Sequence, residues 1–187
     1  SAGLLILRGF APGGFNVGLA PKFDARFDAL WQRVGQDFAV ILVRDSAYLT
    51  WRFSKCPHKT YETVTVDRGG DLAGYATLRV EESRGLKQAL VVDLLAGRND
   101  RRALRALLDA VDAYGRAQRI DVISCTVSRD QKWLRDALRR CGYLAANPGL
   151  PVVMGTGGLY RDVLPTLRDW YLTRADSDVE MGGDVTP

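Results

Sequence analysis

A lone carboxylate stands inside a run of apolar residues. Asp93 occupies the middle of Leu90-Val-Val-Asp-Leu-Leu95, and this branched apolar pattern indicates a buried strand. A carboxylate with such neighbours must be paired with a cation or have its pKa raised, and a raised pKa suits a general base. Two interpretations follow: Asp93 accepts a proton in catalysis, or it forms a buried ion pair with an arginine such as Arg52 or Arg79.

Two other groups of reactive side chains have simpler explanations. The only histidine, His58, follows Cys56 closely in a short basic loop, and basic neighbours lower the pKa of a thiol. No second histidine accompanies them, so we interpret this loop as surface and not as the site of a thiol nucleophile. Asp176-Ser-Asp178 has the spacing of some divalent-cation sites, but no nucleotide-binding pattern supports it, and we expect a solvated tail without a metal.

The composition is that of a globular protein of ordinary polarity. Of the 187 residues, 47% are apolar and 26% are charged, which is enough apolar material for one well-packed domain. The net charge of +4 and the pI of about 9.1 are too mild to indicate a nucleic-acid partner without a binding motif. No apolar run reaches the roughly 18 residues that cross a membrane. The three cysteines have no C-x-x-C spacing, which suits reduced thiols in a cytoplasmic protein.

The first half of the chain alternates short strands and helices. An apolar strand over Leu4–Leu7 precedes a stretch rich in Gly and Pro up to Lys22, which predicts a long connection. The elements predicted beyond it are a helix over Phe23–Val34, a strand over Phe38–Val43, a helix over Ser46–Phe53 capped by Asp45, a strand over Tyr61–Val66, a turn at Arg68–Asp71 and a strand over Leu72–Val80. Within the second helix, Trp51 is expected to pack on the sheet and Arg52 to brace a carboxylate or a strand end.

In the second half of the chain, predicted strands and helices alternate. The predicted elements are a strand over Gln88–Ala96, a helix over Asp100–Arg116, a strand over Ile120–Thr126, a helix over Gln131–Arg140 that ends in Cys141-Gly-Tyr143, and a last helix ending near Leu172. Together with the antiparallel strands before it, this order resembles the GNAT superfamily of N-acetyltransferases. The resemblance implies an α/β (α+β) fold, in which helices flank a mixed, mostly antiparallel sheet and the parallel central strands splay apart.

The resemblance and the composition divide the chain into three parts. These are an N-terminal strand and connection at residues 1–22, a GNAT-like domain at 23–154, and a C-terminal helix with an acidic tail at 155–187. Because the chain begins on an apolar strand, we expect it to be a piece of a larger protein. Leu4–Leu7 would then dock on a sheet edge or on a missing domain, so the protein partner is an N-terminal domain or a second copy in a homodimer.

The resemblance also implies a cofactor, namely acetyl-CoA or another acyl-CoA. In GNAT enzymes the pantetheine arm of the cofactor runs along the splayed strand, whose backbone N–H and C=O groups can pair with the pantetheine amides as another strand would. In this chain the arm would follow the backbone of Leu94, Leu95, Ala96 and Gly97.

The pyrophosphate of the cofactor would lie where the next helix begins. GNAT enzymes hold it on a glycine-rich loop at a helix N-terminus, and the corresponding stretch from Gly97 to Leu104 contains only that one glycine. Two interpretations remain open at this point. Either the side chains of Arg98, Arg101 and Arg102 hold the phosphates at a helix that starts at Asp100, or Asp100 caps an ordinary helix whose arginines are solvated.

Acyl transfer to an amine needs a group that accepts the amine proton and a group that protonates the leaving thiolate. Asp93 lies on the strand that lines the active-site cleft of the family, which makes it the candidate base. Many members of the family use a tyrosine four residues before the Gly-aromatic pair as the acid, and Leu138 stands at that position here. Tyr143 is therefore the nearest phenol and the candidate acid.

One subgroup of the family resembles this sequence more closely than the family as a whole. Its pattern matches Arg44-Asp45, Tyr48-Leu-Thr-Trp-Arg52, Pro57, Tyr61, Trp170 and Asp176-Ser-Asp178, and its members belong to bacterial polysaccharide and cell-surface gene clusters. We therefore expect an acyl-CoA-dependent N-acyltransferase that acetylates a small-molecule amine, such as an amino sugar or another cell-surface precursor. The alternative is a non-catalytic GNAT-like module that lost its phosphate loop and serves as a binding or interdomain scaffold.

Overall fold

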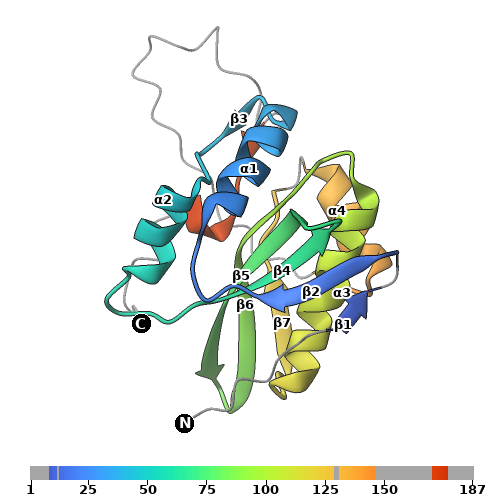
Figure 1. Ribbon diagram of the computed structural model, residues 1–187. Helices are drawn as coiled ribbons and strands as arrows, with labels where there is room; N and C mark the ends of the chain where they lie inside the picture. The colour runs from blue at the N-terminus through green and yellow to red at the C-terminus, as the bar shows by residue number, and fades with distance from the viewer. Residues whose placement is uncertain (1–8, 12, 129–130, 146–169, 177–187) are drawn as a thin grey trace, which may run out of the picture.

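A single mixed sheet organises the part of the chain that the structure describes. The computed structural model describes residues 9–11, 13–128, 131–145 and 170–176. Within these residues the main sheet has the order β1-β2-β4-β5-β6-β7 (Figure 1). The strands are β1 (Gly9–Ala11), β2 (Phe15–Leu19), β4 (Glu62–Arg68), β5 (Asp71–Ser83), β6 (Leu86–Ala96) and β7 (Val122–Cys125). Neighbouring strands are antiparallel except β6 and β7, which are parallel, so the predicted fold class is confirmed.

Helices cover both faces of this sheet. They are α1 (Ala25–Val34), α2 (Ser46–Leu49), α3 (Arg101–Ala117) and α4 (Lys132–Arg140). Phe27 of α1 contacts Tyr75 of β5, with ring centroids 5.4 Å apart. A side chain at the adjacent Gly74 would instead meet Leu107 of α3 at 3.4 Å. Because successive residues of a strand face opposite sides, α1 and α3 lie on opposite faces of the sheet.

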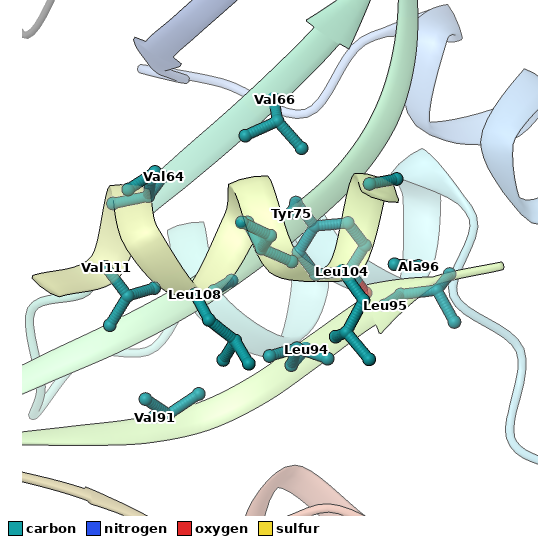
Figure 2. Packing of buried hydrophobic residues seen from close by; sticks show 14 of the residues in the cluster. Val64, Val66, Tyr75, Val91, Leu94, Leu95, Ala96, Leu104, Leu108 and Val111 are labelled. Carbon is teal, nitrogen blue, oxygen red and sulfur yellow. The ribbon is translucent and has the colours of Figure 1, made fainter. Parts of the chain in front are cut away.

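The hydrophobic core lies largely between α3 and the central strands. Figure 2 shows Leu104 and Leu108 of α3 packed near Val64, Val91 and Leu94 of the sheet, and all five side chains are buried. Burial of such side chains contributes about 1.5–3 kcal/mol each relative to full exposure. The central strands are therefore held rigidly from the α3 side, while α1 packs on their other face.

Carboxylates cap the helices where the sequence predicts them. The side chain of Asp45 accepts a hydrogen bond from the Tyr48 N–H at the start of α2, and Asp100 accepts one from the Ala103 N–H at the start of α3. The helix α2 continues as a π-helical turn over Thr50–Ser54, so the helical segment predicted to end at Phe53 is confirmed. None of the described helices is long and apolar enough to span a membrane.

Three elements differ from their predictions. The strand expected over Phe38–Val43 is the short β3 (Val40–Ile41), which lies outside the main sheet and pairs in parallel with β8 (Trp170–Tyr171). The strand β2 pairs with β4 in the main sheet. The Gly and Pro residues around β2 had indicated a connection and not a strand. The last helix was predicted to end near Leu172, but Trp170–Tyr171 is a strand. The rest of that helix and Leu4–Leu7 lie outside the described residues, and the division into three parts stays a prediction.

Candidate active site

The strand β6 has an open edge beyond its contact with β7. The two strands are parallel neighbours, as predicted, and they pair from Gln88 opposite Val122 to Val91 opposite Cys125. Beyond Val91, β6 continues to Ala96 without a partner strand on that side among the described residues. On the side of β5, the pairing register shifts by one residue. Asp93 lies opposite Thr77 and Val91 lies opposite Leu78, so Val92 has no partner and forms a bulge. A bulge of this kind bends a strand and re-aims its side chains.

Asp93 lies at this bulge and is buried, with 1% of its surface exposed. One carboxylate oxygen accepts hydrogen bonds from Arg44 Nε at 3.2 Å and from Thr173 Oγ1 at 2.8 Å. The other accepts one from the Tyr75 hydroxyl at 2.7 Å. Three donors and an opposite charge therefore satisfy the carboxylate inside the protein, as a buried charge requires.

The buried ion pair of Asp93 is thus present, but its partner is Arg44 and not Arg52 or Arg79. Arg79 pairs with Glu81 on its own strand, with the charged atoms 2.9 Å apart. Arg52 donates to the Ala175 carbonyl at 2.8 and 3.1 Å. It therefore holds the segment that contains Ala175, which is a structural role as predicted, although this partner is a backbone carbonyl in a 3-10 turn and neither a carboxylate nor a strand end.

Arg44 joins Asp93 to a second carboxylate. Its Nη2 lies 2.6 and 2.8 Å from the two oxygens of Asp176, and the side chains of both residues are almost completely buried. Burial opposes the charge on Arg44, but the carboxylates of Asp93 and Asp176 outweigh it and raise the pKa of the guanidinium above its ordinary value. Burial also raises the pKa of Asp176, against the opposing effect of Arg44. We call Arg44, Tyr75, Asp93, Thr173 and Asp176 the Arg44 cluster.

The segment Trp170–Asp176, which we call the C-terminal strap, lies against the open edge of β6. Its Tyr171 hydroxyl donates a hydrogen bond to the Leu94 carbonyl, and the buried Tyr171 ring contacts Phe38 with centroids 4.6 Å apart. Gln131, at the start of α4, donates through Nε2 to the Trp170 carbonyl at 3.0 Å. The strap therefore bridges β6, β3 and α4.

The start of α3 is the place predicted for the pyrophosphate. The Asp100 carboxylate accepts from the Ala103 N–H at 2.9 Å and from Arg68 Nη2 at 2.6 Å. Partial burial opposes its ionisation, but these donors outweigh it and lower the pKa of Asp100. The Arg98 N–H donates to Asp37 at 3.0 Å. Two carboxylates thus engage N–H groups that a glycine-rich loop would offer to phosphate.

The other predicted site residues are arranged around this helix start. Leu95, Ala96 and Gly97 are buried, whereas the side chains of Arg98, Arg101 and Arg102 are exposed. A cavity of about 610 Å³ opens on the same loop, and its charged and polar lining comes from Arg33, Asp37, Arg68, Asp71, Asn99 and Asp100. Both arginines and aspartates line it, so its wall carries charges of both signs.

Tyr143 lies apart from the Arg44 cluster. Its hydroxyl donates to Asp112 of α3 at 3.1 Å, and burial together with Asp112 raises the pKa of the phenol. It shares no hydrogen-bond partner with Asp93. Leu138, at the family's tyrosine position, is buried in the core. The structure therefore does not join Asp93 and Tyr143 in one hydrogen-bonded group.

Comparison with known proteins identifies the fold. No protein-family model and no curated protein matches the sequence. Among solved structures, an aminoglycoside acetyltransferase from an uncultured soil metagenomic sample, in complex with sisomicin, matches with a TM-score of 0.57 and 11% identity over 76% of this chain and 96% of that chain. A ribosomal-protein-alanine N-acetyltransferase from Brucella melitensis matches with a TM-score of 0.57 and 15% identity over 76% and 99% of the two chains. A protein from Thermus thermophilus matches with a TM-score of 0.54 and 20% identity over 74% and 98%.

The chain has the GNAT acetyltransferase fold. At identities of 11–20% the likeness concerns the fold, and the chemistry must be argued from the site. In this GNAT-fold chain, the strap and the Arg44 cluster fill the space beside the edge of β6.

Sequence reasoning missed several members of this site. Arg44 was visible only as part of a subgroup pattern. Asp176 was expected in a solvated tail, which is wrong, because its side chain is buried against Arg44. Tyr75 and Thr173 carried no local signal because their partners lie 18 and 80 residues away. Trp51 was interpreted as packed on the sheet, and this is wrong: it is 59% exposed and rests against Tyr48, since the π-helical turn directs it outward. His58 is exposed, consistent with a surface loop.

Proposed function

We propose that this protein transfers an acyl group, in the simplest case acetyl, from an acyl-CoA to the amine of a small molecule. The acceptor class we propose is an amino sugar or another bacterial cell-surface precursor. The observation that supports the proposal is the edge of β6 between Val92 and Ala96, which continues past its last β7 partner at a bulge. An extended arm that carries amides can add to such an edge as a strand does.

The residues at this edge fit the pantetheine arm in part. The backbone of Leu94 to Gly97 has the extended form that strand addition needs, up to the end of β6. The start of α3 fits less well, because Asp37 and Asp100 already engage N–H groups there. The phosphates would therefore be held by the exposed side chains of Arg98, Arg101 and Arg102. The bound thioester supplies the activated acyl carbonyl.

Asp93 is the residue best placed to hold the proton of the acceptor amine. Its carboxylate lies on the bulge beside the proposed path of the arm. The carboxylate accepts three hydrogen bonds and is 1% exposed, so one donor must leave before a substrate can reach it and it can act as a base. Thr173 is the donor that belongs to the strap. Tyr143 remains the candidate acid for the thiolate, with Asp112 as its present partner.

Calorimetric titration with acetyl-CoA and with longer acyl-CoAs tests the proposal. Saturable binding, followed by release of free thiol when amino sugars and other amines are added, is the expected result. A folded protein that binds no acyl-CoA would overturn it.

A second candidate function is a non-catalytic GNAT-like module. It is favoured by the hydrogen bond between Tyr171 and Leu94, because the chain itself then satisfies the edge that a cofactor would use. Under this hypothesis the Arg44 cluster is a structural clamp, and the module presents its surface to a partner domain. A folded protein that neither binds acyl-CoA nor releases thiol with any amine would favour this module.

A further inference from the structure

The Leu94 carbonyl is a hydrogen-bond acceptor on the open edge of β6, and any group that pairs with this edge must bind there. It lies beyond Val91, the last residue paired with β7, and the Tyr171 hydroxyl donates to it. Tyr171 is 1% exposed, so this contact is closed to solvent. An arm that added to the edge at Leu94 would meet the Tyr171 phenol at the same carbonyl.

The C-terminal strap is held by polar contacts and by two buried side chains, the Tyr171 ring and Ala175. Its strand β8 has only two residues and pairs only with β3 among the described strands. Beyond β8, Thr173 and Asp176 bind the Arg44 cluster, and the Ala175 carbonyl binds Arg52. A hydrogen bond contributes about 0.5–1.5 kcal/mol net to stability, because water or another ligand can replace the partner. Displacement of the strap also exposes the Tyr171 ring and Ala175, so an incoming group must offset this loss of burial as well as take over the hydrogen bonds.

From this geometry we infer that the C-terminal strap is an intramolecular gate over the acyl-CoA path, and that the pantetheine arm binds by displacing Tyr171 from the Leu94 carbonyl. The inference rests on the proposed function. The exchange is balanced at Leu94, since an amide N–H of the arm replaces the phenol as donor. The gate also opposes binding, because only molecules with the strap displaced can accept the arm.

Displacement of the strap has a consequence for Asp93. Thr173 donates one of the three hydrogen bonds to its carboxylate, and Asp176 binds Arg44 beside it. When the strap leaves, Asp93 keeps Tyr75 and Arg44 but gains a free lone pair on the oxygen that Thr173 occupied. The base therefore becomes available to an acceptor amine only after the cofactor has entered.

The test compares Tyr171→Phe with wild type. The variant keeps the buried ring but loses the hydroxyl, so the closed state leaves the Leu94 carbonyl without its donor. Tyr114→Phe is the matched control, because its phenol is also buried and hydrogen-bonded, but to Glu62 at the start of β4 and not to the open edge of β6. Acetyl-CoA and pantetheine are titrated by calorimetry, and hydrogen exchange of residues 170–176 is followed with and without acetyl-CoA.

We expect acetyl-CoA to bind Tyr171→Phe about 5- to 10-fold more tightly than wild type, because the loss of one hydrogen bond raises the open fraction by that factor. Tyr114→Phe should bind as wild type does, and exchange of residues 170–176 should accelerate when acetyl-CoA binds wild type. Equal affinities with a strap that stays protected would overturn the gate and leave the proposed function standing. No binding even by Tyr171→Phe combined with Asp176→Asn, with exchange showing the strap released, would overturn both.

Discussion

The guanidinium of Arg44 and the carboxylate of Asp93 form a salt bridge of 3.2 Å with no exposed surface on either side chain. The two residues are 49 positions apart and come from the segment between β3 and α2 and from the bulge of β6. Arg44 also binds Asp176. A single arginine, from the segment between β3 and α2, thus connects the central strand β6 to the C-terminal strap through buried ion pairs.

Replacing Arg44 by methionine should therefore be strongly destabilising. It leaves Asp93 and Asp176 buried without their cation, and loss of one partner of a buried pair costs about 3–5 kcal/mol. Urea unfolding followed by circular dichroism measures the change. Arg105→Met is the matched control, since Arg105 forms an exposed pair with Asp109 within α3 and should leave the midpoint unchanged. Equal midpoints for wild type and Arg44→Met would contradict the clamp role.

Asp100 should give the protein a pH-dependent contribution to stability. Its folded-state pKa is lowered below the ordinary 3.8, so the unfolded chain binds the proton more tightly. The contribution is therefore fully present above 3.8 and is lost as the pH falls through the lower folded-state pKa. Asp100→Asn keeps a capping side chain without the charge. Wild type should be the more stable of the two at neutral pH, and unfolding curves at decreasing pH should converge. A difference that persists at the acid end would show that another group carries the effect.

The side chains of Arg101 and Arg102 should hold the pyrophosphate of the cofactor. Replacing both by alanine should weaken acetyl-CoA binding by about 1.5–3 kcal/mol for each charged hydrogen bond that is lost. Titration calorimetry provides the measurement, and Arg116→Ala, in the last turn of the same helix, is the control. Unchanged affinity in the double variant would mean that the arginines are only solvated, which is the other interpretation of this helix start.

Opening of the strap should also be visible in the fluorescence of its own tryptophan. Trp170 belongs to β8, and Trp133 stacks on Tyr171 with ring centroids 6.1 Å apart. Saturation with acetyl-CoA should therefore shift the tryptophan emission of wild type toward longer wavelength, as these rings become hydrated. Trp170→Phe should reduce the shift. A titration that shows heat of binding but no spectral change would indicate that the strap stays in place.

Local patterns were sufficient to predict most of the sheet and the helices. The apolar run from Gln88 to Ala96 and the helical spacing after Asp100 each specify their element within a short window, because burial of one face requires that period. The carboxylates of Asp45 and Asp100 could be assigned as caps for the same reason, since a cap binds an N–H three residues away. The order of these elements then indicated the GNAT fold.

The partners inside the candidate site were decided by the tertiary structure. The sequence shows that Asp93 needs a cation, but it offers several arginines, and only the packing of the segment before α2 against β6 brings Arg44 to it. Tyr171 and Leu94 are 77 residues apart, and no periodicity connects them. Apolar periodicity and helix capping involve residues close together in the chain, so they can be recognised in the sequence. Which of several chemically equivalent partners a side chain binds depends on distances that are set only when the chain has folded.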